Sequence, residues 1–377
     1  MIVQQTLLRP NASLQLFSFE GVGSVSEYHT IIHAAAGLTF EDQCRAVLEA
    51  IDYISGHTGA TPVFARFFMS DAANQEADLR TLVGSRPYAL SYIQQTPLDG
   101  TKIACWLYLQ SGIATPELRE GLACVSHGGY THLWSAGKHT TSGDSLAQGT
   151  HLFHNYSRHL VAEGCTLRDN CIRTWLFVND IDNNYAGVVL ARNNVFAAEG
   201  LTNDTHFIAS TGIGGRTADH NALVQMDAYA VAGISQSQVQ YLYAPDHFNR
   251  TSDYGVSFER GTAVNYGDRQ HVFISGTASI DNGGQIVHLG NIEAQTLRMI
   301  DNVEALLREA GASYDHVAQI IVYLRDPSDY AQVAALFGER FPNKPIVIVL
   351  AAVCRPGWLI EMECIAVREH STAFPAF

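Results

Sequence analysis

The feature that most constrains the fold of this chain is an order of secondary structure that repeats along it. The clearest copy opens with the short strand ISGTASI and continues with an amphipathic helix that ends at Gly311, a typical C-cap residue. A buried strand follows, then a helix that begins at Pro327, then two more strands. The predicted helices of this copy span 292–310 and 327–341, and its later strands span 317–326, 346–353 and 358–367.

The same order is predicted twice more. The middle of the chain has helices at 149–165 and 183–200 and strands at 170–180, 205–211 and 222–231, and its VQMDAYAV aligns with IEMECIAV of the clearest copy. A fainter N-terminal copy has a helix at 40–59 and strands at 61–71 and 101–110. We therefore predict an α+β fold of repeated modules, with boundaries 1–115, 116–233 and 234–377. The alternative is a generic α+β layering in which the similarity arises by chance.

Composition limits the class of protein and of ligand. The chain has 377 residues, 47% of them hydrophobic, and a formal net charge of -14. That charge argues against nucleic acid or an anionic membrane as the main partner, and an anionic small molecule would need a local arginine pocket. The 7 cysteines form no CxxC pair, and neither a signal peptide nor a membrane helix is apparent. We expect a soluble cytoplasmic protein.

Two carboxylates on the last strand of the third copy are the candidates for chemistry. Glu361 and Glu363 share one face of that strand, because residues i and i+2 point the same way. Burying both is costly, so we expect one pKa to be raised until that group can donate a proton near neutral pH. The second copy has Gln225 and Asp227 in these places, and the first copy has CWL in this region. The alternative is that Glu361 simply pairs with an arginine of a neighbouring copy.

Arginines are the natural partners of a carboxylate ligand, because their planar fork binds both oxygens and stays charged. The candidates are Arg216, Arg260 and Arg355, with Tyr254 as a further ligand contact, whereas Arg325 and Arg340 are typical of surface ion pairs. The segment TGIGG lacks a P-loop lysine, the 16 histidines form no HExxH or Cys-His pattern, and GxSxG does not occur. We therefore expect no metal, nucleotide or other cofactor.

Residues 256–367 resemble the Rid/YjgF family. The matching stretches are ISGTASI, HLGNIEAQTLRMIDNVEALLREAGASYDHVAQIIVYLRDPSDY and LIEMECIAV. Members of this family are small α+β subunits with a chorismate mutase-like fold that pack as trimers, with ligand clefts between subunits. The resemblance implies that the three copies form an intrachain pseudo-trimer, with Ser275 and Glu361 lining a cleft. One departure is that Rid imine deaminases carry an arginine on the strand after the second helix, where this chain has KPIVIVLAAV, and Arg260 falls where they have a tyrosine.

From about residue 120 onward the chain resembles a narrower group, the chorismatases, which are Rid-related enzymes of secondary metabolism that remove pyruvate from chorismate. The resemblance lies in IRTWLFVNDIDNNY, THFIASTGIGGR, SFERGTAV and VCRPGWLIEMEC. It implies that Glu361 is the catalytic acid and that Gly267 and Cys354 steer the product. Glycine with cysteine at these places resembles the branch that makes 3-hydroxybenzoate.

The resemblance also implies a cofactor-independent reaction. A neutral Glu361 would protonate the vinyl carbon of the enolpyruvyl ether, while Arg260 and Arg216, helped by Arg355, hold the two carboxylates. Cys354 would lie over the ring, either taking part in catalysis or acting as a small apolar filler. The alternatives are hydrolysis to 3,4-dihydroxycyclohexa-1,5-diene carboxylate, Rid-type imine deamination, and a non-catalytic carboxylate-binding protein. An internal pseudo-trimer also implies a monomer.

Overall fold

The chain forms three β-sheets. The computed structural model describes residues 1–377 except for the side chain of Tyr254, so this predicted ligand contact lies outside the described residues. The first sheet has the spatial order β1-β2-β3-β7-β4-β5, the second β12-β11-β13-β10-β9-β8, and the third β14-β15-β16-β19-β17-β18-β6. Strands of the first sheet are β1 (Ile2–Arg9), β2 (Ala12–Phe19), β3 (Glu27–Ala34), β4 (Ala60–Met69), β5 (Ala89–Gln94) and β7 (Ile103–Ser111). Strands of the second are β8 (Glu117–Arg119), β9 (Leu122–His127), β10 (Tyr130–His139), β11 (Cys171–Val178), β12 (Ala209–Gly214) and β13 (Val224–Ala232). Strands of the third are β6 (Thr96–Pro97), β14 (Val239–Leu242), β15 (Gly261–Asn265), β16 (Arg269–Ala278), β17 (Val317–Leu324), β18 (Ile346–Leu350) and β19 (Ile360–Glu369).

The three sheets share one topology. In each, a central strand pairs in parallel with the strand that follows it in the module: β4 with β5, β11 with β12, and β17 with β18. On its other side the central strand pairs antiparallel with the last strand of the copy, which is β7, β13 or β19. The predicted α+β fold of repeated modules is thereby confirmed, and the N-terminal copy, faint in sequence, is complete in structure.

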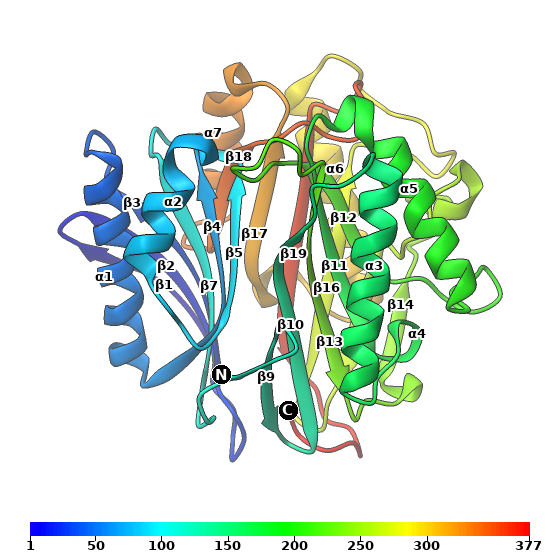
Figure 1. The fold of residues 1–377 in the computed structure, drawn as a ribbon, viewed down its shortest axis with the longest axis horizontal. Coiled ribbons are helices and arrows are strands. Elements are labelled where there is room, and N and C mark those ends of the chain that lie inside the picture. The colour runs from blue at the N-terminus through cyan, green and yellow to red at the C-terminus, as the bar shows by residue number, and fades with distance from the viewer.

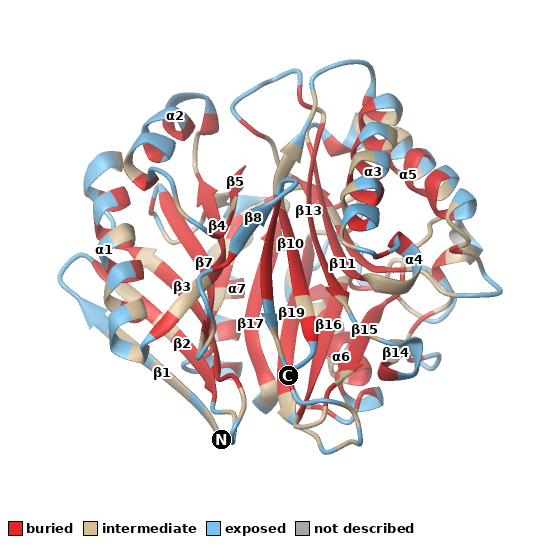
Figure 2. Ribbon diagram, turned by 60° about the horizontal axis from the view of Figure 1, so that its bottom comes forward, coloured by how far each residue is buried: buried red, intermediate tan, exposed pale blue. Residues whose placement is uncertain are grey.

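Helices cover the outer face of each sheet, and the sheets face one another (Figure 1). Within the described residues the helices are α1 (Phe40–Thr58), α2 (Ala72–Val83), α3 (Ser145–Ala162), α4 (Leu167–Asn170), α5 (Ile181–Ala198), α6 (Ile292–Glu309) and α7 (Tyr330–Arg340). No helix among them is long and apolar enough to cross a membrane. Figure 2 shows buried strands in the middle of the molecule and exposed residues on the outward faces of the helices.

Contacts between the sheets close a ring of three. Strand β5 lies against β10, β12 against β16, and β17 against β3, so each module contacts the next and the third contacts the first. The largest apolar cluster accordingly contains residues of all three sheets, whereas two smaller clusters lie between the first and second sheets and their own helices. This ring is the intrachain pseudo-trimer that the repeat predicts.

The helix ends follow local sequence signals. Helix α6 starts after Asn291, whose side chain accepts a hydrogen bond from the Ala294 amide, and ends as predicted before Gly311, which has a φ of 72°. The second predicted helix of this module begins later than expected. Pro327 opens a short 3-10 turn, and the α-helix itself starts at Tyr330.

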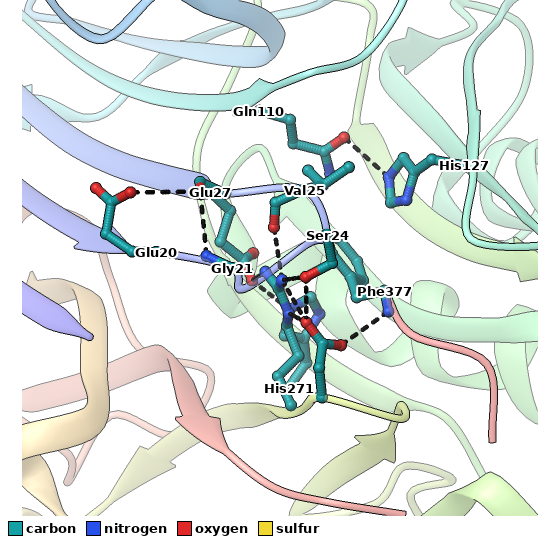
Figure 3. Close-up of polar contacts among 12 residues, drawn as sticks. Glu20, Gly21, Ser24, Val25, Glu27, Gln110, His127, His271 and Phe377 are labelled. Carbon is teal, nitrogen blue, oxygen red and sulfur yellow. Dashed lines mark hydrogen bonds and ion pairs between the residues drawn. The ribbon is translucent and has the colours of Figure 1, made fainter. Parts of the chain in front are cut away.

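A buried charged cluster joins the first and third modules at the end of the β16–β19 ladder that lies away from Glu361. The Glu27 carboxylate accepts hydrogen bonds from Arg269 at 2.7 Å and from His271 at 2.8 Å (Figure 3). Burial raises the pKa of Glu27, but the contacts with His271 and Arg269 hold it well below its usual value. The ring of Phe377 packs beside Arg269 and His271. Within the described residues no group of three or more His, Cys, Asp and Glu could hold a metal ion.

Candidate active site

The pairing registers identify equivalent positions on the three last strands. In each module, the residue one before the end of the central strand pairs with a residue near the start of the last strand. These pairs are Phe68 with Ala104, Phe177 with Gln225, and Tyr323 with Glu361. A carboxylate therefore occupies this position in the third module alone. Of the three equivalent positions, only this one has a candidate acid.

Glu361 is buried against the strand that contains ISGTASI. It is 5% exposed and lies opposite Ala278 on β16. A Cβ atom on Gly276 would stand 2.2 Å from Glu361 Oε1, so glycine at this position is what gives the carboxyl its space. The backbone of the Ser-Gly-Thr segment of this strand therefore lies close to the candidate acid. Burial and repulsion by Glu363, only partly offset by Arg173 and Arg260, raise the pKa of Glu361 to about 8.

Glu363, the second carboxylate of the pair, is fully engaged in hydrogen bonds. It accepts from Arg173 Nη2 at 2.8 Å and from Trp175 Nε1 at 2.7 Å, both on β11 of the second module, and from the Thr211 hydroxyl. These contacts hold Glu363 against the second module. The two carboxylates therefore have different environments: one is paired across a module boundary, and the other faces a cavity.

That cavity lies between the second and third modules and has a volume of about 190 Å³. The second module contributes residues of α5 and β12. The third module contributes residues of β16 and β19 and of the segments that precede β15 and β19. The lining residues are Tyr185, Arg192, Ser210, Gly212, Val256, Phe258, Arg260, Gly276, Ala278, Ile280, Cys354, Arg355, Trp358 and Glu361.

Arg192 is a cavity residue that the sequence analysis did not select. It is 1% exposed, and neither Nε nor Nη2 has a hydrogen-bond partner among the described residues. Its guanidinium carbon lies 5.7 Å from the centre of the Phe258 ring. Because unpaired N–H groups on a buried cation are costly, this arginine favours an anionic ligand. A signal existed in the sequence: Arg192 shares the buried face of α5 with Val188 and Val195.

Three predicted site residues do reach the cavity besides Glu361. Arg260 is buried, with Phe248 at 4.7 Å and Phe258 at 5.4 Å from its guanidinium carbon, and it also lines a neighbouring cavity of about 330 Å³. Arg355 stacks on Trp358 at 4.7 Å. Burial and the charge of Glu361 raise the pKa of Cys354 to about 12, which keeps this residue a thiol.

Three other predicted residues do not line it. Ser275 is buried behind the cavity, where its hydroxyl donates to the Glu259 carbonyl at 2.6 Å and accepts from the Ser210 amide at 2.9 Å. Its neighbour Gly276 lines the cavity instead, because adjacent residues of a strand point to opposite sides. Ser275 thus ties the second module to the third.

Arg216 and Gly267 lie at other contacts. Arg216 donates to Gln94 Oε1 at 3.0 Å and pairs through its backbone with the same residue, so it joins the second module to the first. Gly267 follows β15 at the end of the ladder far from Glu361, and a Cβ atom there would stand 2.3 Å from the Phe374 carbonyl oxygen. Because Gly267 has no side chain, the backbone of residues 374–376 can pack directly against it. Neither residue therefore lines the cavity beside Glu361.

Comparisons with known proteins agree with the module and the ring. Residues 261–368 match the family described as Endoribonuclease L-PSP. A RutC family protein of Pyrococcus abyssi is 41% identical over 101 residues, which are 26% of this chain and 79% of that protein. The 3-aminoacrylate deaminase RutC of Acinetobacter baylyi is 30% identical over 97 residues, which are 25% of this chain and 77% of that enzyme.

A solved structure extends the likeness beyond one module. A crystal structure of chorismatase superposes with a TM-score of 0.64 at 18% sequence identity, covering 81% of this chain and 93% of that one. At this identity the likeness concerns the fold, and it shows that the arrangement of modules occurs in a chorismatase.

Proposed function

This chain belongs to the RutC (Rid/YjgF) family, and from that premise we propose that it is a chorismatase that converts chorismate to 3-hydroxybenzoate and pyruvate. The observation that carries the proposal is a carboxyl with a pKa raised to about 8, buried at a cavity that also contains a buried arginine whose Nε and Nη2 have no hydrogen-bond partner among the described residues. An acid that is neutral at physiological pH, beside fixed cations, suits the protonation of a dianionic substrate.

The first step is proton transfer from Glu361 to the vinyl carbon of the enolpyruvyl ether. This transfer gives an oxocarbenium ion and leaves Glu361 as a carboxylate, whose charge stabilises the cation. Glu363 assists indirectly, because its fixed negative charge disfavours ionisation of Glu361 before substrate arrives.

Arginines hold the two substrate carboxylates. Arg192, on α5, lies on the side of the cavity that the second module forms. Arg260, before β15, and Arg355, before β19, lie on the side that the third module forms. Arg192 replaces Arg216 in the scheme that the sequence suggested. The cavity is smaller than the roughly 300–1,000 Å³ typical of sites for drug-sized ligands, which suits a single six-membered ring.

The 3-hydroxybenzoate branch remains part of the proposal on the strength of Cys354. Its thiol lines the cavity close enough to Glu361 for the two to interact electrostatically, and it is small enough to leave the ring unobstructed. The runner-up outcome is hydrolysis to the dihydroxycyclohexadiene carboxylate. A Rid-type imine deaminase is the second candidate function, which the likeness to a 3-aminoacrylate deaminase favours.

One assay separates these functions. Purified protein is mixed with chorismate, and pyruvate, 3-hydroxybenzoate and the diene diol are quantified chromatographically; a parallel sample receives an imine substrate, and ammonia is measured. We expect pyruvate and 3-hydroxybenzoate in equal amounts. Ammonia without pyruvate would replace the proposal with deamination, and binding of chorismate without turnover would replace it with a non-catalytic role.

The pH dependence of the reaction follows from Glu361. Because the acid form is required, kcat/KM is expected to stay level at neutral pH and to fall tenfold per pH unit above about 8. The same raised pKa contributes folding stability that is complete below the unfolded-state pKa and is lost as the pH rises through about 8. A pH–rate profile checks the first expectation, and a rate that keeps rising beyond pH 9 contradicts it.

Arg192→Leu should separate binding from stability. Loss of two charge-assisted hydrogen bonds of about 1.5–3 kcal/mol each is expected to raise KM for chorismate by at least tenfold. The free energy of unfolding should stay constant or rise, because the substitution removes a buried cation whose Nε and Nη2 have no hydrogen-bond partner among the described residues. Steady-state kinetics and urea unfolding measure the two effects. Arg158→Leu, on the exposed face of α3, is the control and should leave KM unchanged.

A further inference from the structure

The two outcomes of chorismate cleavage differ by one water molecule. In hydrolysis, water adds to the oxocarbenium carbon, the bond from that carbon to the ring oxygen breaks, and the products are pyruvate and a diol that keeps both ring oxygens. In the other branch, the neighbouring ring hydroxyl displaces pyruvate, losing its proton, and the resulting epoxide opens to 3-hydroxybenzoate without uptake of water. Exclusion of water from the oxocarbenium carbon therefore decides the product, a point that rests on the proposed function.

The floor and the rim of the cavity differ in exposure. Glu361, Arg192 and Arg260 are buried, whereas Tyr185 and Cys354 are half-buried. Water that reaches the ring must therefore pass the rim. Tyr185 and Arg192 are seven residues apart on α5, which is about two helical turns, so one face of this helix supplies both a cation and a rim residue.

The ring of Tyr185 packs against a strand of the second module. It lies on β12 at Gly212, where a Cβ atom would stand 2.8 Å from Tyr185 Cε2 and 3.1 Å from its hydroxyl oxygen. Tyr185 also lines the cavity together with Cys354, which belongs to the third module, and its side chain partly offsets the raised pKa of that thiol. Tyr185 on the second module and Cys354 on the third thus border the same cavity.

We propose that Tyr185, lying on Gly212, is a specificity-determining residue that covers the rim and keeps water from the oxocarbenium carbon of the bound intermediate. Gly212 is required for this role because any side chain there would displace the Tyr185 ring. The hydrophobic ring rather than the hydroxyl is the excluding group, since it supplies the area that occupies the rim.

The experiment measures total pyruvate and the ratio of diene diol to 3-hydroxybenzoate in four variants. Tyr185→Ala removes the cover, and Gly212→Ala displaces it while keeping the tyrosine; both are expected to raise the ratio at least tenfold. Tyr185→Phe keeps the ring and should stay within about twofold of the wild type. Gly338→Ala, a glycine with no atom within 4 Å of an added Cβ, is the matched control and should leave the ratio unchanged.

The outcomes are distinguishable from failure of the proposed function. If the wild-type protein releases no pyruvate from chorismate, the proposed chorismatase function is contradicted. Pyruvate released by Tyr185→Ala and Gly212→Ala at the wild-type product ratio overturns the role of Tyr185 alone, as does diol as the sole wild-type product. If Tyr185→Ala does not fold, Gly212→Ala decides, because it keeps every side chain of the cavity.

Discussion

Glu361→Gln is expected to lower kcat for pyruvate release by roughly 10²–10⁴-fold, the usual contribution of a positioned general acid. The amide is the same size as the acid but has no proton to give to the vinyl carbon. The fold should tolerate it, because the equivalent position of the second module already carries Gln225, whose Nε2 donates to Ser91 at 3.2 Å. The measurement is pyruvate release at saturating chorismate.

The control for this variant is the same substitution on the same strand. Glu369 ends β19 with its side chain 76% exposed, so Glu369→Gln should retain wild-type turnover. Circular dichroism and thermal unfolding establish that both variants are folded. Near-normal turnover by a folded Glu361→Gln protein would remove the acid role and leave a binding site.

The sequence predicts the framework well because the framework is periodic. Helix α6 and strand β17 start at the predicted residues, since apolar spacing and a C-cap glycine define them locally. Glu361 is predictable for a related reason. Two carboxylates on a buried strand contradict the apolar pattern around them, and such a contradiction often indicates function.

The residues that the sequence misassigned are those whose role depends on contacts between modules. Arg216 follows a glycine-rich turn that is typical of ligand binding, but the chain there faces the first module rather than the third. Ser275 and Gly276 are adjacent in sequence, and only the packing of β12 against β16 shows which of them meets the cavity. Arg192 appears in a helix, where an arginine usually faces solvent, and it is buried only because α5 borders the third module.

A buried ion pair between modules gives the second large expected effect. Arg173→Met should lower the free energy of unfolding by about 3–5 kcal/mol, because the buried Glu363 carboxylate loses its cation at 2.8 Å and keeps only Arg66, which lies 3.9 Å away and is already paired with Asp227. Urea unfolding measures the loss. Arg340→Met is the matched control: its partner Glu304 lies 3.7 Å away and both side chains are about half exposed, so a loss below about 1 kcal/mol is expected.

The double variant tests whether the loss comes from the unpaired charge or from packing. Arg173→Met with Glu363→Gln removes both charges, so it should recover much of the stability that Arg173→Met loses, giving a coupling free energy of about 1–3 kcal/mol. It also removes the like charge that raises the pKa of Glu361, as well as the cation that lowers it. Additive losses, with no recovery in the double variant, would contradict an electrostatic origin and assign the effect to the packing of Arg173 against Trp175, 4.9 Å away.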